Sequence, residues 1–313
     1  MTDLLRRRLT ATGHLLAMGA VSWVFSEGMF WAHWREDAGV ADLLATWLAY
    51  SVVTMLALAA ARRFAVSTIA GLFLVGALFG WLVEGAIAGT TFAEFPVGLS
   101  WTGLAWHAPL TVCIGWCLLP AVLRRRRPPE VLATVGALGI WLGLWTAGFV
   151  HGPDELGAPP VWAVTAYAAG LAAALAIAYP ACDRLAAAAH RPPSRLALAV
   201  AALATAGWFA LAVVPAVPPA AVLLPALLAL PLLALRRGRV RPPGTPLLDR
   251  VAEPLRARDT LPLALLPVTV APVYAAAEPF AGIAPVVVVY VLCVPGGVAA
   301  LVWSMRRVAR VGA

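Results

Sequence analysis

The sequence predicts an all-α protein: a polytopic membrane helix bundle of about ten transmembrane helices with both chain ends in the cytoplasm. Hydrophobic residues make up 62% of the 313 residues and charged residues only 12%, whereas soluble domains carry about 25% charged residues. Ten apolar runs are long enough to cross a bilayer, which takes about 20 helical residues. The basic residues also fall almost entirely on one side of the resulting topology.

Short polar or proline-rich connections separate the predicted spans. Their expected boundaries are 13–34, 40–61, 64–88, 101–123, 130–150, 161–182, 195–217, 219–235, 260–277 and 284–305. The first run is too long for a signal-peptide core and lacks a small-residue cleavage site, so it is expected to stay as a span. The seventh and eighth runs meet at Pro215, Pro218 and Pro219. One broken re-entrant element, and hence nine spans, is therefore the alternative.

The arginines test this topology independently. The 23 basic residues are all arginine, and with the N-terminus inside, every one except Arg35 faces the cytoplasm. This bias sets the orientation of membrane proteins, and it predicts an integral protein of the inner (cytoplasmic) membrane of a bacterium. The net charge of +8 then reflects contact with anionic lipid headgroups. We expect membrane lipids as partners and no nucleic acid.

The chain divides into two parts of different composition. Residues 1–182 contain spans one to six, with eleven of the 13 tryptophans and every acid that falls inside a span. Residues 183–313 contain spans seven to ten, which are rich in Ala, Leu, Val and Pro, and the basic cytoplasmic loop 236–259. Leu247, Leu248, Val251 and Leu255 recur in that loop at helical spacing, which predicts a short interfacial helix. A functional site is expected in the first part.

Three ionisable side chains fall inside spans at a similar depth from the outer surface. At 1.5 Å of rise per residue, Glu27 lies about 10 Å deep, Glu84 about 6 Å and His107 about 9 Å. A charged group inside a span costs about 2.5–3.5 kcal/mol on insertion scales. We therefore expect an outward-facing pocket in which two carboxylates and an imidazole share protons. The alternative is a Glu84–His107 clasp that only holds two helices together.

Tryptophans and further polar residues surround this predicted pocket. The expected lining residues are Trp23, Trp31, Trp81, Trp106, Trp141 and Trp145. The expected rim residues are His33, Asp37, Glu94, His151, Asp154 and Glu155. Deep tryptophans beside acids can bind an apolar or cationic ligand through their ring faces. Trp34, by contrast, is expected at the outer end of the first helix, on the same face as Glu27.

The motifs that hold metals or cofactors are missing from the sequence. No H-x-x-x-H or E-x-x-H pair, no phosphate-binding loop and no G-x-G-x-x-G with a downstream acid occurs. We therefore expect no metal and no cofactor. The four cysteines, Cys113, Cys117, Cys182 and Cys293, form no paired extracellular framework and are expected to be packing residues.

Three functions remain open at this point. Ten spans in 313 residues are typical of drug and metabolite transporters, which favours a proton-coupled carrier of a small organic solute. Glu27 and Glu84 would carry protons and His107 would relay them. The alternative is an intramembrane enzyme that acts on a lipid or isoprenoid by Glu/His acid–base chemistry. A second alternative is a non-catalytic membrane subunit that binds a partner or a lipid. The dissimilar halves argue against a carrier built from repeats.

Overall fold

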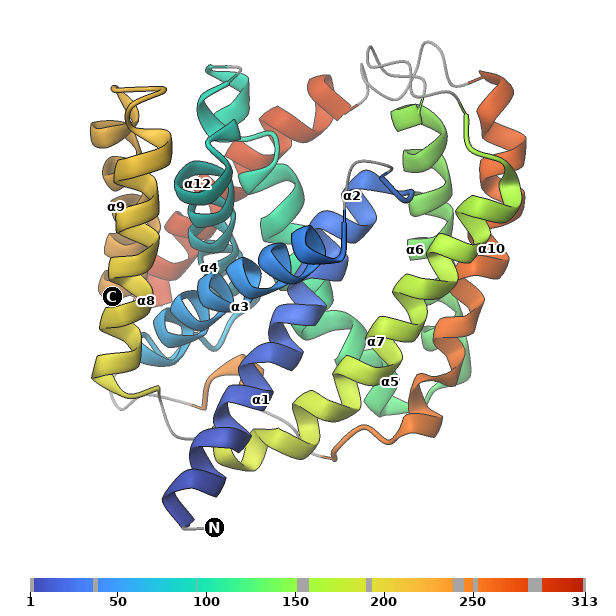
Figure 1. The fold of residues 1–313 in the computed structure, drawn as a ribbon, viewed down its shortest axis with the longest axis horizontal. Helices are drawn as coiled ribbons and strands as arrows, with labels where there is room; N and C mark the ends of the chain where they lie inside the picture. The colour runs from blue at the N-terminus through green and yellow to red at the C-terminus, as the bar shows by residue number, and fades with distance from the viewer. Residues whose placement is uncertain are drawn as a thin grey trace.

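The computed structural model describes residues 3–35, 39–93, 95–150, 158–189, 193–238, 245–249, 253–280 and 289–311. The chain is 86% helix, and no strand occurs in these described ranges. The all-helical prediction is therefore confirmed. Figure 1 shows the helices as a single tilted bundle, with α8 and α9 along one edge and α6 and α10 along the other.

Ten helices within the described ranges are long and apolar enough to cross a membrane, which makes this a multi-pass membrane protein. The seventh and eighth are separate helices, so the nine-span alternative is not needed. The elements that build the ten are α1 (Asp3–Trp23) with η1 (Val24–Gly28) and α2 (Met29–Trp31); α3 (Val40–Arg63); α4 (Ile69–Trp81) with η2 (Leu82–Ala88); η4 (Val97–Leu99) and η5 (Gly103–Leu118) with α5 (Leu119–Arg125); α6 (Pro128–Val150); α7 (Val161–Ala189); α8 (Arg195–Trp208) with η6 (Phe209–Val213); α9 (Ala220–Arg237); η8 (Ala257–Ala264) and α10 (Leu265–Ala277) with η9 (Glu278–Phe280); and η10 (Val289–Cys293) with α12 (Val294–Val311).

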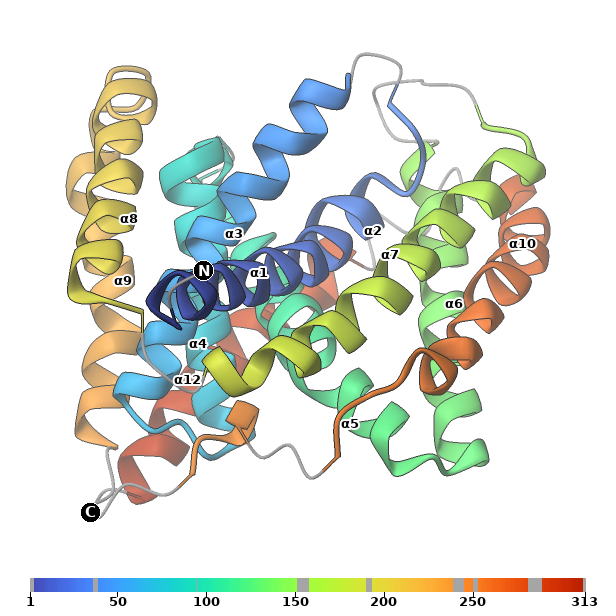
Figure 2. The same ribbon diagram turned by 60° about the horizontal axis from the view of Figure 1, so that its bottom comes forward.

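α4 lies at the centre of the bundle. Every residue from Ala70 to Trp81 is buried, and α4 packs against α3, η5, α9 and α12. A second group of helices, α1, α6, α7 and α10, lies beside it. α1 packs against α3 and α7, and both α7 and α6 pack against α10. Figure 2 shows the same arrangement from a second direction. Of the helices in residues 183–313, α8 and α9 thus lie along one edge of the bundle and α10 along the other, whereas α12 packs against the central α4.

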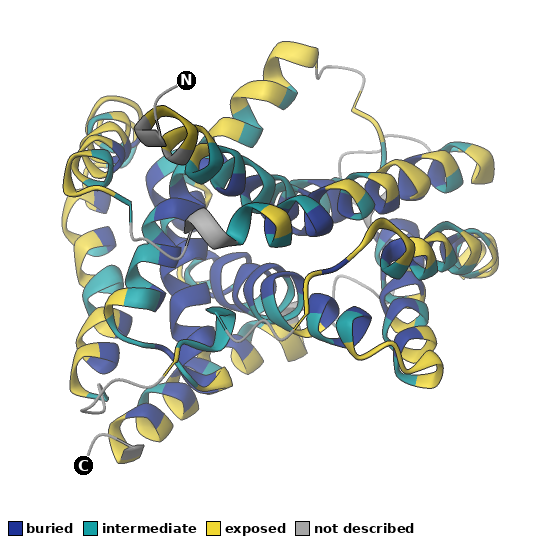
Figure 3. Cartoon of the chain, turned by 90° about the horizontal axis from the view of Figure 1, so that it is seen from below, coloured by how far each residue is buried: buried dark blue, intermediate teal, exposed yellow. Residues whose placement is uncertain are grey.

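The outer surfaces of the peripheral helices are strongly apolar. Leu203, Leu211 and Val222 on α8, η6 and α9 are 72%, 83% and 73% exposed, and Ile177 on α7 is 73% exposed. Figure 3 shows how the exposed positions follow the outside of the bundle while the buried ones gather in the middle. Contiguous apolar surface of this kind is unfavourable in water and is what lipid tails require, so the burial pattern agrees with a membrane location.

α4 and η5 approach each other with almost no side chain between them. A Cβ atom on Gly76 would lie 2.6 Å from the Cα of Ala108, and one on Gly80 would lie 2.5 Å from the carbonyl oxygen of Gly103. Gly76 and Gly80 are four residues apart, so both face the same neighbour. This is the small-residue spacing that lets membrane helices pack closely. The contact therefore depends on glycine at both positions of α4.

Two local expectations were wrong. The first helix ends at Trp31 rather than reaching Trp34, because Ala32 adopts a left-handed conformation with φ of 62°. Trp34 instead packs edge-to-face on Tyr167 of α7, with ring centroids 4.9 Å apart. In the described parts of loop 236–259, the short 3-10 turn η7 (Leu247–Asp249) is followed by non-helical residues 253–256 and by the start of η8, in place of one helix through Leu255. Leu247 and Leu248 pack against the hydrophobic core, and Leu255 is only 2% exposed.

Ion pairs hold this connection to one end of the bundle. The nitrogen–oxygen distances are 3.4 Å for Arg62–Asp249, 2.6 Å for Arg124–Asp183 and 2.9 Å for Arg126–Asp259. Asp183 is the most constrained member. Its side chain is 4% exposed, and it also accepts a 2.7 Å hydrogen bond from the backbone N–H of Leu255. One carboxylate thus joins α5, α7 and the connecting segment.

The glycine contact predicts a sharp difference between two conservative substitutions. Gly80→Ala should lower the free energy of unfolding by about 1–3 kcal/mol, because its methyl group meets backbone atoms that cannot move alone. Gly207→Ala is the matched control, since nothing lies within 4 Å of its added Cβ. Thermal unfolding of the purified protein in detergent measures both. Equal stability of the two variants would contradict the close α4–η5 contact.

The buried ion pair predicts a second contrast. Asp183→Asn should destabilise the fold by about 3–5 kcal/mol, because it leaves the partly buried Arg124 without its counter-charge. Glu130→Gln removes a solvent-accessible partner of Arg125 and Arg127 and should change stability far less, because solvent screens such surface pairs. Chemical denaturation followed by tryptophan fluorescence compares them. A larger loss of stability in Glu130→Gln than in Asp183→Asn would refute the role of Asp183 in joining these segments.

Candidate functional site

Glu27, Glu84 and His107 each lie in a stretch of π-helix. Glu27 is in η1 within the first span, Glu84 is in η2 at the C-terminal end of the third, and His107 is in η5 within the fourth. π-Helical turns inside longer helices are rare and frequently occur at functional sites. Three of the five π-helical stretches in the described ranges therefore contain one each of Glu27, Glu84 and His107.

Aromatic donors support the backbone around these stretches. A shift away from α-helical hydrogen bonding leaves some carbonyls in need of other donors. Trp106 Nε1 donates to the carbonyl of Phe25 at 3.0 Å, and the Tyr167 hydroxyl donates to that of Gly28 at 2.9 Å. In η5, the carbonyl of Gly115 accepts from the Tyr179 hydroxyl. These bonds fix the irregular backbone that carries the acids and the histidine.

Glu84 and His107 form a direct pair. His107 Nε2 lies 2.6 Å from Glu84 Oε1, and the side chains are only 3% and 12% exposed for His107 and Glu84, respectively. The Thr90 hydroxyl donates to the second oxygen of Glu84. Because α4 continues into η2 and packs on η5, the glycine contact between these helices sets the distance between the two side chains.

The other ring nitrogen of His107 meets hydroxyl groups. Nδ1 lies 3.0 Å from Ser26 Oγ and 3.4 Å from Thr111 Oγ1, and these two hydroxyls are 2.9 Å apart. A hydroxyl both donates and accepts. It can donate to Nδ1 of a neutral imidazole and accept from Nδ1–H of an imidazolium. The network therefore accommodates His107 with or without an added proton.

Glu27 accepts two hydrogen bonds, and both donors are neutral groups. Trp31 Nε1 donates to Oε2 at 2.6 Å, and the Tyr50 hydroxyl donates to Oε1 at 3.1 Å. On the same indole, the guanidinium carbon of Arg35 lies 4.2 Å from the ring centroid. Trp31 thus connects the carboxylate of Glu27 to the charge of Arg35 without a direct ion pair.

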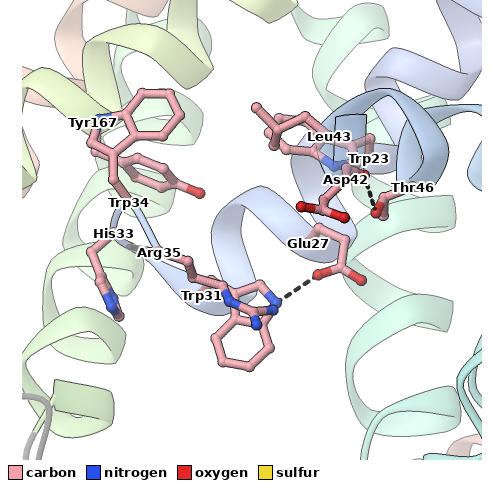
Figure 4. Close-up of a pocket in the computed structure, with 10 residues that line it drawn as sticks. All are labelled: Trp23, Glu27, Trp31, His33, Trp34, Arg35, Asp42, Leu43, Thr46 and Tyr167. Carbon is pink, nitrogen blue, oxygen red and sulfur yellow. Dashed lines mark hydrogen bonds between the residues drawn. The ribbon is translucent and has the colours of Figure 1, made fainter. Parts of the chain in front are cut away.

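Two cavities meet at these residues. The acid cavity holds about 310 Å³, and its walls include Ser26, Glu27, Phe30, Trp31, Tyr50, Glu84, Thr90, Trp101, Thr102 and His107. The arginine cavity holds about 340 Å³, and its walls are Trp23, Glu27, Trp31, His33, Trp34, Arg35, Asp42, Leu43, Thr46 and Tyr167. Figure 4 shows the arginine cavity, with Tyr167, Trp34 and His33 on one side and Glu27, Asp42 and Thr46 on the other. Glu27 and Trp31 belong to both cavities and form the partition between them.

The structure brings together some of the residues that the sequence singles out and separates others. Glu27, Glu84 and His107 line the acid cavity, and Trp23, Trp31 and His33 line the arginine cavity. Neither wall includes the four other tryptophans, Trp81, Trp106, Trp141 and Trp145. Asp37, Glu94, His151, Asp154 and Glu155 lie outside the described residues.

The remaining tryptophans support the walls from behind. Trp81 Nε1 donates to the carbonyl of Leu99. Trp106 packs against Trp141 and Trp145, with ring centroids 4.9 and 4.8 Å away, and against Phe30 at 5.1 Å. Since Phe30 lines the acid cavity, this cluster holds one of its aromatic walls in place.

Several residues of the site were not predicted from the sequence. They are the hydroxyl-bearing side chains Ser26, Tyr50, Thr90, Thr102 and Thr111. A usable signal exists for two of them, because Ser26 precedes Glu27 and Thr111 lies one helical turn beyond His107. The described residues contain no group of three His, Cys, Asp or Glu side chains that could hold a metal ion.

The hydroxyl network predicts a stability difference between two buried threonines. Thr111→Val should lower the free energy of unfolding by about 1–2 kcal/mol, because Ser26 and His107 Nδ1 lose a shared partner. Thr146→Val is the matched control, since that hydroxyl bonds only the carbonyl of Leu142 in its own helix and its loss should cost far less. Thermal unfolding in one detergent compares them. Equal losses would mean that the network around His107 contributes nothing.

The chain matches no protein-family model, no curated protein and no solved structure.

Proposed function

We propose that this protein is a proton-coupled carrier of a small organic solute in the inner (cytoplasmic) membrane, with both chain ends in the cytoplasm. The orientation rests on the arginine distribution. The observation that carries the proposal is the acid cavity, in which a Glu84–His107 pair and Glu27 line a space of about 310 Å³. Ligand sites of small molecules start at about 300 Å³. Groups that exchange protons and a space for a solute thus coincide.

A second feature favours transport over catalysis. A smaller cavity of about 70 Å³ lies toward the end of the bundle where α3, α5 and η7 meet, and Trp116 is part of its wall. The buried side chain of Phe79 contacts one wall residue of this cavity and one of the acid cavity. The ring of Phe79 is 5.4 Å from that of Trp116 and 5.7 Å from that of His107. A carrier needs a thin barrier of this kind between spaces that face opposite sides of the membrane.

In the proposed cycle the proton and the solute use the same groups. A proton on Glu84 or His107 changes the charge of the acid cavity without breaking the hydroxyl network, since Ser26 and Thr111 can reverse their hydrogen bonds. A proton on Glu27 weakens its acceptor role toward Trp31 and Tyr50. Solute binding and proton binding then influence each other through linked equilibria. Rearrangement around Phe79 would open the opposite cavity.

Solute uptake into proteoliposomes tests the proposal. Vesicles with a pH gradient are given a defined mixture of amines, carboxylic acids, sugars and amino acids, and the trapped compounds are identified by mass spectrometry. We expect at least one compound to accumulate with the wild type and to stop accumulating when an ionophore removes the gradient. Glu84→Gln should reduce its uptake to the level of empty vesicles, because it removes the acid of the pair.

Glu278→Gln is the control, because this acid lies at the outer end of α10 and lines neither cavity. It should leave uptake unchanged. If solute uptake is the same with Glu84→Gln as with the wild type, and the same with and without the pH gradient, proton coupling at this site is refuted. A compound that is chemically altered rather than accumulated would favour the enzyme alternative instead.

A further inference from the structure

We infer that the acid cavity binds a monovalent organic cation with one flat apolar group. This inference rests on the proposed function for its role in transport, but the binding site itself does not. Its first support is the charge of the wall. Among the described residues that line it, the cavity presents two carboxylates, Glu27 and Glu84, and one imidazole, but no arginine. An anionic solute would meet only like charge from the two acids.

Glu27 provides the second support. Its hydrogen bonds from Trp31 and Tyr50 orient the carboxylate but bring no positive charge. An ionised carboxylate inside a span is costly without a counter-charge. Glu84 has His107 as a partner. A bound cation would therefore stabilise the ionised carboxylate of Glu27 more than that of Glu84. When no cation is present, a proton can neutralise Glu27, and the two would compete for it.

Aromatic side chains supply the third support. Phe30, Trp31, Tyr50 and Trp101 are part of the same wall as the two acids. The negative face of an aromatic ring attracts alkylammonium groups, and sites for quaternary ammonium compounds combine several such rings. Flat apolar groups also stack on rings of this kind. A volume of about 310 Å³ is at the lower end for ligand sites, which suits one ring with a small ammonium group.

The arginine cavity is less suited to the cation. Its wall also has two carboxylates, Glu27 and Asp42, but Arg35 offsets one of these charges and lies over the ring of Trp31. A cation there meets the repulsion of Arg35 and finds that indole already occupied on one side. Trp31 and Glu27 form the partition, and the Arg35 charge lies in the wall of the arginine cavity (Figure 4). The charge distribution therefore directs a cation to the acid cavity.

Binding of benzyltrimethylammonium to the purified protein tests this inference. Its charge is permanent, so any pH dependence comes from the protein. Benzenesulfonate and benzyl alcohol serve as anionic and neutral probes with the same ring. Tryptophan fluorescence and thermal stabilisation of the protein in detergent measure affinity. We expect the cation to bind at least about tenfold more tightly than either other probe and to bind more weakly as the pH falls, because protons compete for the carboxylates.

Variants locate the site. Glu27→Gln and Glu84→Gln should each weaken binding of the cation by about tenfold or more, and Trp31→Phe by about threefold through the loss of the indole. Glu278→Gln should leave it unchanged. Equal affinity for the three probes overturns the inference, as does a wild-type affinity for the cation that does not depend on pH. That second criterion holds even if a variant fails to fold.

The outcome separates this inference from the proposed function. A protein that binds the cation at Glu27 and Glu84 but moves no solute would keep the cation site and refute the carrier. Uptake of an anionic or neutral solute that Glu84→Gln abolishes would keep the carrier and overturn the cation assignment.

Discussion

The backbone contact between α4 and η5 is the constraint on which the site depends. In a bilayer, helices gain little from hiding apolar surface, because lipid tails are equally apolar, so close packing and hydrogen bonds must hold them together. Gly76 and Gly80 allow that approach at Ala108 and Gly103. One turn beyond Gly80, the same helix places Glu84 within 2.6 Å of His107. Close packing between α4 and η5 thus creates a polar pair one helical turn further along.

The sequence predicted the helices well because the cost of exposing backbone groups to lipid leaves little choice of structure. It also indicated Glu27, Glu84 and His107 by their depth, since an ionisable group inside a span needs a reason to be there. The structure brings these three to one cavity. The hydropathy pattern does not indicate how each helix is rotated about its own axis. It also does not indicate where the backbone departs from α-helical geometry. The left-handed turn at Ala32 and the π-helical stretches at all three residues follow from tertiary packing.

The tryptophans illustrate the same limit. Composition gathers them in residues 1–182, and spacing places Trp141 and Trp145 on one helix face, with ring planes 7° from parallel in the structure. Spacing within one helix does not tell whether that face meets a cavity or another helix. Here Trp106 packs against both of them, while Trp31 divides two cavities. Only the positions of neighbouring helices distinguish a supporting tryptophan from a lining one.

We propose that protons and an organic cation compete for one set of carboxylates in the acid cavity. Proton release when benzyltrimethylammonium is added to the wild-type protein in weakly buffered detergent solution measures this directly, at several pH values and against the Glu27→Gln and Glu84→Gln variants. The account predicts release of up to about one proton per bound cation in the wild type, and less in each variant. Cation binding with no proton release at any pH would contradict it.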